Sequence, residues 1–138
     1  MVKFKVIGEP VGKARHRYVM RGKHVQTYTP EKTILYEELV KTSYLEQVKD
    51  KRMLEGSLNA KITAFFKIPK STPKYKAEKM IKGEIIPTKK PDLDNIAKAV
   101  LDALNGVAYH DDKQIGTLFV EKYYSTEPRV EVILVEKR

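Results

Sequence analysis

Residues 93–105 carry the pattern that most constrains what this chain can fold into. Their apolar side chains recur at i, i+3, i+4, i+7, i+8 and i+11, which is the spacing of one helix face. The residues on this face are Leu93, Ile96, Ala97, Val100, Leu101 and Leu104. Asn105-Gly106 then gives a typical helix stop. A helix with a single apolar face has to be buried against another layer, which the rest of the chain must supply.

The remaining apolar patterns predict mostly strands. Alternating residues, or runs rich in Ile, Val, Phe and Thr, indicate strands over 2–7, 17–20, 24–28, 58–68, 115–124 and 130–136. Arg21-Gly22-Lys23 is typical of a hairpin turn between the second and third of these segments. Ser125-Thr126-Glu127-Pro128 predicts an antiparallel hairpin between the last two.

A second long helix is expected over 31–48. Thr29 is a good N-cap residue, and Pro30 is favoured at the first helical position. The apolar stripe of this helix is made of Tyr36, Leu39, Val40, Tyr44 and Val48. A short helix could form over 75–81. Because strands and helices mix without strict βαβ order, we expect an α+β fold: a single two-layer domain over residues 1–138, with a mixed or mostly antiparallel sheet and helices packed on one face.

The composition excludes several classes of protein. The 138 residues are 41% hydrophobic and 33% charged, which is a globular composition of one domain's size. The sequence has no cysteine, so a disulfide scaffold, a zinc–thiolate site, an iron–sulfur cluster and a cysteine nucleophile are excluded. No apolar run approaches the roughly 18 residues that span a membrane, and the N-terminus lacks the apolar core of a signal peptide. We expect a cytoplasmic protein with no membrane partner.

The charge of the chain favours an anionic partner. Lys and Arg number 27 against 18 Asp and Glu, a net +9, which favours nucleic acid ahead of an anionic membrane surface. Residues 1–24 hold seven basic residues against one acid, and residues 67–90 hold eight against two. Each segment is therefore +6 and the remainder is −3, with five Asp between positions 92 and 112. A protein that only coats phosphates does not need this acidic group.

The acidic residues form two short motifs that suit metal chemistry. Asp92-Leu93-Asp94 begins the predicted helix, and Asp111-Asp112 follows it. On the helix, Asp94, Lys98 and Asp102 share one edge. Carboxylates are the ligands that Mg²⁺ takes together with water and phosphate oxygens, and two such ions can hydrolyse a phosphodiester. A lysine one turn away can neutralise charge that develops on the phosphate.

Each of these acids also has a structural interpretation. Asp92 could be an N-cap and Asp111-Asp112 a turn, while for Asp102 we favour a solvated helix residue. The two motifs meet only if residues 107–110 run back along the helix, and four extended residues cover roughly 13 Å of its length of about 20 Å. An EF-hand loop, a haloacid-dehalogenase-like Asp-x-Asp and a Gly-rich phosphate loop are excluded, because the flanking residues that they need are missing.

Basic residues flank the acidic group. Lys89 and Lys90 precede Asp92 and would hold a DNA backbone beside it. The segment Gly12-Lys13-Ala14-Arg15-His16-Arg17 is either a phosphate-binding turn or a solvated run of charge. We favour contact with DNA through Lys13, Arg15 and Arg17, because this agrees with the second basic segment.

Residues 90–115 resemble the RusA family of Holliday-junction resolvases, metal-dependent endonucleases that prophages often carry. The motifs are Pro-Asp-Leu-Asp-Asn (91–95), Lys98, Leu-Asp-Ala-Leu-Asn-Gly (101–106), Asp111-Asp112 and Gln114-Ile115. Residues 10–15 are similar, more loosely, to the family's N-terminal basic segment. The resemblance implies an α+β homodimer that binds a four-way DNA junction and makes symmetric nicks, with Mg²⁺ as cofactor and Mn²⁺ as a substitute.

The resemblance also implies roles for individual residues. Asp92, Asp94 and Asp112 match the family's metal ligands, and Asp111 is the neighbouring acid that can assist. Lys98 matches the catalytic lysine. Lys90 and Asn95 match positions linked to DNA contact or to organising the site. The leading hypothesis is therefore a Mg²⁺-dependent resolvase of DNA recombination and repair.

Two questions stay open at this point. The alternative function is a non-catalytic basic nucleic-acid-binding protein, a degenerate prophage relative.

The second open question is the dimer interface. A two-fold dimer would present two equal sites to the paired strands of a junction. The apolar segments 58–68 and 81–86 are candidates for its interface, or equally for the core.

Overall fold

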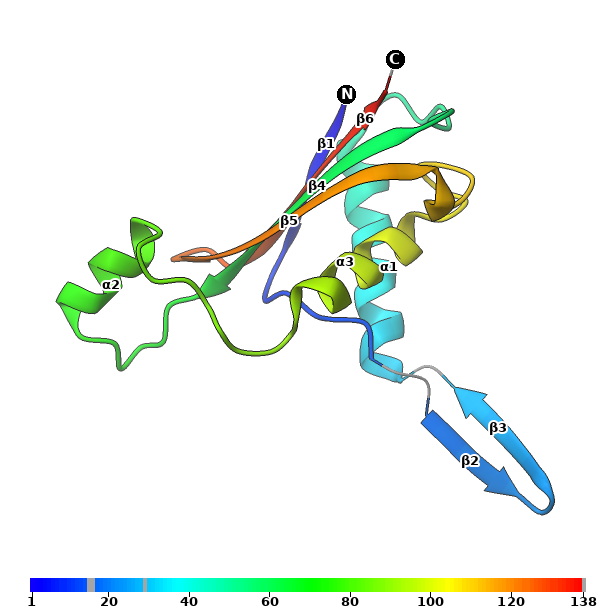
Figure 1. The fold of residues 1–138 in the computed structure, drawn as a ribbon, viewed down its shortest axis with the longest axis horizontal. Coiled ribbons are helices and arrows are strands. Elements are labelled where there is room, and N and C mark those ends of the chain that lie inside the picture. The colour runs from blue at the N-terminus through cyan, green and yellow to red at the C-terminus, as the bar shows by residue number, and fades with distance from the viewer. Residues whose placement is uncertain (15–16, 29, 138) are drawn as a thin grey trace.

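The computed structural model describes residues 1–14, 17–28 and 30–137, and its fold is drawn in Figure 1. In chain order the elements are β1 (Val2–Ile7), β2 (Arg17–Arg21), β3 (His24–Tyr28), α1 (Glu31–Gln47), β4 (Leu58–Lys67), α2 (Lys74–Ile81), α3 (Leu93–Leu104), the 3₁₀ turn η1 (Asp112–Gln114), β5 (Ile115–Ser125) and β6 (Arg129–Glu136). The predicted strands and helices are all present, within one or two residues at most ends. Thr29 lies outside the described residues, and Pro30 occupies the N-cap position.

A mixed four-stranded sheet forms the centre of the described fold. Its strand order is β1-β6-β4-β5, with β6 antiparallel to both β1 and β4, and β5 parallel to β4. The predicted hairpin between β5 and β6 is wrong, because β4 lies between these two strands. Alternate residues of β4 are buried, from Leu58 to Phe66, and the strand is paired on both edges, with β5 on one side and β6 on the other. The turn after Ser125 therefore passes over the end of β4.

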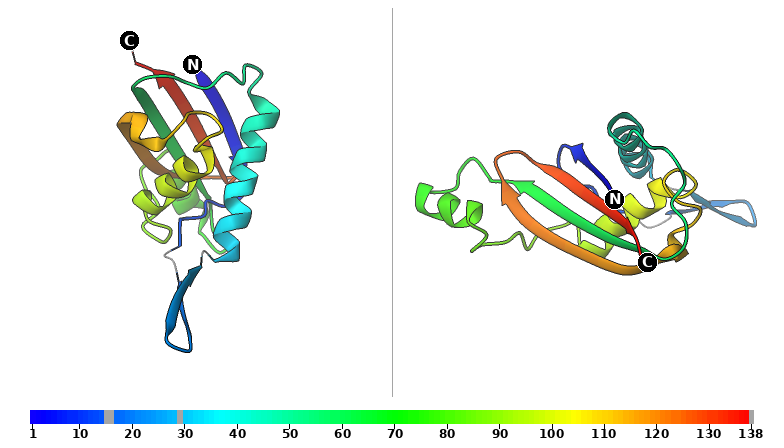
Figure 2. Two further views of the ribbon diagram at one scale, coloured as in Figure 1. Left: turned by 90° about the vertical axis from the view of Figure 1, so that its right-hand side faces the viewer. Right: turned by 90° about the horizontal axis from the view of Figure 1, so that it is seen from above.

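Helices α1 and α3 cover one face of this sheet, which confirms the predicted α+β architecture (Figure 2). The core lies between the two layers and takes its side chains from β1, β4, β6 and both helices. Phe4 of β1 meets Tyr44 of α1 edge-on, with ring centroids 5.6 Å apart. Of the predicted apolar stripes, Leu39 and Leu93 are exposed, since each lies at the border of its helix's buried face. The candidate interface segment 58–68 is core along its inward side.

Among the helices α1, α2 and α3, α3 has the largest share of buried residues. Its buried residues are Ile96, Ala97, Ala99, Val100, Leu101, Ala103 and Leu104. Burial of this face fixes the rotation of the helix, so that Asp94, Lys98 and Asp102 stay on the partly solvated edge. The sheet and α1 thereby set the direction in which the charged edge of α3 points.

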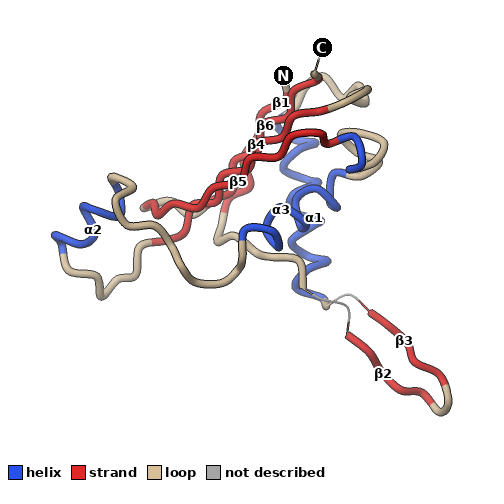
Figure 3. Tube along the Cα trace, viewed as in Figure 1, coloured by secondary structure: helices blue, strands red, loops and turns tan. Residues whose placement is uncertain are grey.

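Two segments extend away from the sheet and its covering helices. The β2–β3 hairpin, predicted from the turn at Gly22, projects at one end, and α2 lies near the far end of β5 (Figure 3). In the described part of the chain, no helix is both long and apolar enough to cross a membrane.

Candidate functional site

Lys98 and Asp102 form the centre of a charged group on α3. They are one turn apart, and the Nζ atom of Lys98 donates to Oδ1 of Asp102 at 3.0 Å. This hydrogen bond and the charge of Asp102 raise the pKa of Lys98. The Asp102 side chain is only 17% exposed, so its interpretation as a solvated helix residue is wrong. Burial is possible because both carboxylate oxygens have cationic partners.

Lys13 is the second cation on Asp102. Its Nζ atom lies 3.4 Å from Oδ2 of Asp102 and 2.7 Å from Oε1 of Glu37, which is on α1. Partial burial lowers the pKa of Lys13, but the hydrogen bond and charge of Glu37, together with Asp102, outweigh it and raise the value. Glu37 was not anticipated from the sequence, since nothing in a helical pattern indicates which exposed glutamate meets a distant lysine.

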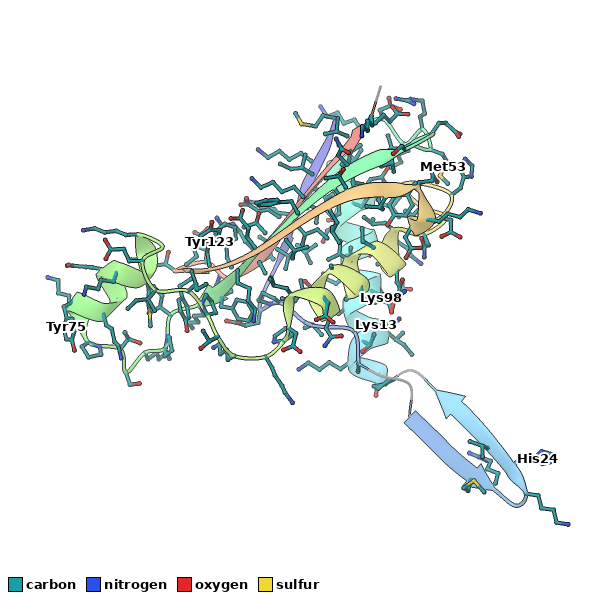
Figure 4. All side chains as sticks on the ribbon, in the orientation of Figure 1. Lys13, His24, Met53, Tyr75, Lys98 and Tyr123 are labelled. Atoms are coloured by element: carbon teal, nitrogen blue, oxygen red, sulfur yellow. The ribbon has the colours of Figure 1, made fainter. Side chains whose placement is uncertain are left out.

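The segment around Lys13 crosses the first turn of α3. The backbone N–H of Lys13 donates to the carbonyl of Asn95 at 2.8 Å. Gly12 lies so close that an added Cβ would be 2.7 Å from Cβ of Pro91 and 2.9 Å from Cβ of Asn95. Glycine is therefore required at position 12 for this segment to lie directly on the start of α3. Figure 4 shows Lys13 and Lys98 on this side of the molecule.

Asp112 approaches Lys98 from the other side. Its Oδ2 atom is 4.0 Å from Nζ of Lys98, and its backbone N–H donates to Oδ1 of Asn105 at 2.8 Å. Burial raises the pKa of Asp112, and a hydrogen bond with the neighbouring Asp111 raises it further. Lys98 therefore faces two carboxylates that belong to different elements.

Asp111 has a structural task. Its Oδ1 atom accepts the backbone N–H of Lys113 at 3.1 Å, and the side chain of Gln114 accepts the N–H of Asp111 in return. The N–H of Lys113 is the main cause of the lowered pKa of Asp111. The Gln114 amide also donates to the carbonyls of Leu54 and Gly56. This capping box fixes η1 and leaves Asp112, rather than Asp111, beside Lys98.

Tyr109 determines where η1 meets α3. Its side chain is fully buried, and its hydroxyl donates to the carbonyl of Leu101 at 2.6 Å. Burial raises the pKa of Tyr109 strongly, so the hydroxyl stays protonated as a donor. The chain after α3 is thereby held at the C-terminal half of the helix. The structure brings Asp112 to Lys98 and Asp102.

Asp92 and Asp94 lie at the other end of α3. Asp92 is the N-cap residue, Asp94 is in the first turn, and both are exposed. Asp94 precedes Lys98 by one turn, about 6 Å along the helix axis. Within residues 1–14, 17–28 and 30–137, no three acidic or histidine side chains are grouped closely enough to enclose a metal ion.

The carboxylates nevertheless suit an open magnesium site. Mg²⁺ is usually held by one or two protein carboxylates, with waters and substrate phosphate as the other ligands. Asp102 and Asp112 both direct an oxygen at the position of the Lys98 ammonium. Of the carboxylates that match the family's metal ligands, Asp112 lies beside Lys98, whereas Asp92 and Asp94 lie at the start of α3, so an ion here would be completed by water and phosphate and not by a closed protein cage.

A cavity of about 630 Å³ adjoins the start of α3. It is lined by the segment after β1, by the first turn of α1 and by residues before α3, and includes Lys13, Lys32, Lys90, Asp92 and Asn95. Three predicted DNA-binding residues, Lys13, Lys90 and Asn95, are thus gathered in one cavity beside Asp92. The cavity is large enough for a nucleotide-sized ligand.

The other predicted DNA-binding residues lie elsewhere or are not described. The carbonyl of Lys89 accepts from Nζ of Lys122 at 2.6 Å, and the Lys89 ammonium lies 5.8 Å from the ring centroid of Phe66. Lys89 therefore packs toward β4 and β5. Arg15 and the side chain of Arg17 lie outside the described residues.

Comparison with known proteins identifies the family of this chain. Residues 8–135 match the family described as "Endodeoxyribonuclease RusA", a class of DNA-cleaving enzymes. The chain is also 39% identical over 137 residues to "Uncharacterized protein YqaN" of Bacillus subtilis (strain 168), covering 98% of this chain and 96% of that protein. The chain belongs to the RusA endodeoxyribonuclease family, as its aspartate and lysine motifs predicted.

Proposed function

We propose that this protein is a Mg²⁺-dependent, structure-selective endodeoxyribonuclease that resolves Holliday junctions by paired symmetric nicks. The observation that carries the proposal is the position of Lys98 between Asp102 and Asp112, in a chain of the RusA endodeoxyribonuclease family. An ammonium that faces two carboxylates and is itself more than half exposed is available to a phosphate from solvent.

In this proposal the metal ligands are Asp92, Asp94 and Asp112, with Asp111 assisting. A bound Mg²⁺ would activate water and stabilise the leaving oxygen. Lys98 would contact the scissile phosphate and stabilise its developing charge. The position of Lys98, one turn after Asp94 and opposite Asp112, supports a site shared by these residues.

The DNA would be held on the basic side of this site. Lys90, Asn95 and Lys13 line the cavity that also contains Asp92, which supports phosphate binding next to the acids. Lys89, Arg15 and Arg17 would extend the contact along the backbone. Attraction by these cations would bring an anionic strand to an acidic centre that metal ions neutralise.

A homodimer would complete the activity. The paired strands of a four-way junction have equal polarity, so two equal sites related by a two-fold axis match them. Ile81 and Ile86, in the predicted interface segment 81–86, are both exposed, which supports a role in burying a partner surface.

The proposal is tested with a fluorescently labelled synthetic four-way junction. We expect paired nicks at symmetric positions in Mg²⁺ or Mn²⁺, no product with excess chelator, and slow or no cleavage of linear duplex. Asp92→Asn should abolish cleavage and keep junction binding. Asp50→Asn, at an exposed acid beyond α1, is the matched control and should cleave normally. Cleavage by Asp92→Asn at the wild-type rate would contradict the assignment of that ligand.

A second candidate is a non-catalytic basic DNA-binding protein, a degenerate prophage relative. The wide separation of Asp92 from Asp112 along α3 favours it, because these two ligands do not converge in the described structure. This candidate predicts binding to any duplex with a steep salt dependence. It also predicts no junction product in either metal, so the same experiment separates the two functions.

A further inference from the structure

Five side chains form a line of alternating charge through the proposed site. They are Glu37, Lys13, Asp102, Lys98 and Asp112. The successive distances between their charged atoms are 2.7 Å, 3.4 Å, 3.0 Å and 4.0 Å. The line joins α1, the segment after β1, α3 and η1. The last three of these residues lie in the motifs of residues 90–115, Lys13 lies in the more loosely similar segment 10–15, and Glu37 lies outside both.

Lys98 is the most exposed member of this line. The side chains of Glu37, Lys13 and Asp102 are 20%, 19% and 17% exposed, whereas that of Lys98 is 57% exposed. Glu37, Lys13 and Asp102 are therefore largely shielded from water, and the attraction between their charges is screened less than that of a surface pair. Lys98 is the residue of this line whose side chain is most accessible to solvent, and therefore to a substrate.

We propose that Glu37 is a positioning residue for Lys98 and acts through Lys13 and Asp102. The proposal rests on the function proposed above, in which Lys98 contacts the scissile phosphate. Oδ2 of Asp102 is bound to Lys13, and this contact turns Oδ1 toward Lys98. Glu37 holds Lys13 in place at the shorter distance, 2.7 Å.

Loss of Glu37 would release the ammonium of Lys13 without releasing its backbone. The Lys13 N–H remains bonded to the carbonyl of Asn95, so the segment stays on α3. The Lys13 side chain could then bind Asp102 more closely and draw this carboxylate away from Lys98. A lysine that is more than half exposed and loses its anchor regains rotamer freedom, and the phosphate-binding geometry is no longer preset.

Glu38 offers a matched control for this proposal. It is the next residue on α1, is more exposed than Glu37, and pairs with Lys41 at 3.5 Å. The substitutions Glu37→Gln and Glu38→Gln remove the same charge from adjacent positions. A general effect of acidity on DNA binding would appear in both variants, and an effect carried by the line of charge would appear only in Glu37→Gln.

The first measurement is single-turnover and steady-state cleavage of the four-way junction by both variants. Supporting residues around an active group typically contribute roughly tenfold or more to activity, so we expect kcat of Glu37→Gln to fall about tenfold. KM and junction affinity should stay within about twofold of wild type, because Glu37 does not contact DNA in this proposal and Lys13 remains paired with Asp102 on the same side of the site. Glu38→Gln should match wild type in all three quantities. Equal kcat in Glu37→Gln and wild type would overturn the proposal.

The second measurement does not depend on cleavage. In spectra of ¹⁵N-labelled lysine ammonium groups, Lys98→Arg identifies the Lys98 signal by its loss. We expect this signal to shift or broaden in Glu37→Gln and to stay unchanged in Glu38→Gln. An unchanged signal in Glu37→Gln overturns the proposal. A wild-type protein that cleaves no junction would contradict the proposed function alone, since the signal still decides whether Glu37 positions Lys98.

Discussion

The Nζ atom of Lys98 lies 4.0 Å from Oδ2 of Asp112, although one residue comes from the middle of α3 and the other from the turn after it. Two features of the fold create this contact. The capping box of η1 directs Asp112 at the helix, and the buried Tyr109 holds η1 beside the helix's second half. Lys98 therefore projects from a rigid helix. Asp102, on the same helix, and Asp112, on the anchored η1, are both held beside it.

The first prediction concerns Lys98 itself. We expect Lys98→Met to lower the junction cleavage rate roughly 100-fold or more, as removal of one electrostatic stabiliser of a transition state does. Its unfolding midpoint in urea should fall only modestly, because Lys98 is 57% exposed and Asp102 keeps its contact with Lys13. Lys41→Met, which removes an exposed lysine paired with Glu38, is the control and should cleave normally. Cleavage by Lys98→Met at the wild-type rate would refute the role of Lys98.

A second prediction distinguishes the two adjacent acids. We expect Asp112→Asn to lose cleavage almost completely, since Asp112 faces Lys98. Asp111→Asn should lose less, because asparagine also caps helices well and would preserve the bond to Lys113. Initial cleavage rates of the two variants, at saturating Mg²⁺, give the comparison. The assignment of Asp112 as the site residue fails if Asp111→Asn is the more impaired protein.

Much of the fold could be predicted from the sequence because its signals are local. The period of the apolar residues in 93–105 and the turn at Gly22 determine their elements without help from distant segments. The pairing of β5 and β6 could not be predicted in this way. In the structure β4 lies between them. Which strand lies between two others is decided when all the strands pack together, so no local pattern in the sequence indicates it.

The candidate site also contains some residues that the sequence indicates and some contacts that only the structure reveals. Asp112 and Lys98 are predicted as site residues by the resemblance of residues 90–115 to the RusA family, and the structure brings their side chains together. Helix periodicity places Lys98 on the same edge as Asp102, but it gives no sign of the second lysine partner that shields this carboxylate from solvent. Lys13 lies 89 positions earlier in the chain. A contact of this kind follows from how the segment after β1 crosses α3, which has no local signature in the sequence.

A third prediction concerns the anchor of η1. Leu101 is in the last turn of α3, where backbone carbonyls lack helical donors, and the Tyr109 hydroxyl satisfies its carbonyl at 2.6 Å. We expect Tyr109→Phe to reduce the free energy of unfolding by about 1–2 kcal/mol, since a buried carbonyl loses its donor. Urea unfolding followed by circular dichroism measures this. Tyr75→Phe, at an exposed tyrosine on α2, should leave the stability unchanged. Equal stability of both variants would show that the Tyr109 hydroxyl is dispensable.

The last prediction is a pH dependence at the C-terminal end of β6. Glu136 of β6 accepts two hydrogen bonds from Arg52, at 3.0 Å and 3.3 Å, and one from the backbone N–H of Glu55. The bond with Arg52 is the main cause of the lowered pKa of Glu136, whose ordinary value is 4.5. The unfolded chain therefore binds a proton at this residue more readily than the folded chain does.

The sign of the effect follows from this difference. Stability contributed by the Glu136 carboxylate is fully present above about pH 4.5 and is lost as the pH falls through the lowered pKa of the folded state. We expect Glu136→Gln to be less stable than wild type in urea at about pH 7, and the difference to shrink steadily on acidification below about pH 4.5. Added salt should reduce the difference at neutral pH, because the pair is near the surface. Glu127→Gln, at an exposed glutamate in the turn before β6, is the control. A stability difference for Glu136→Gln that stays constant from pH 7 to strong acid would contradict this account, since only an ionised carboxylate can produce the expected loss.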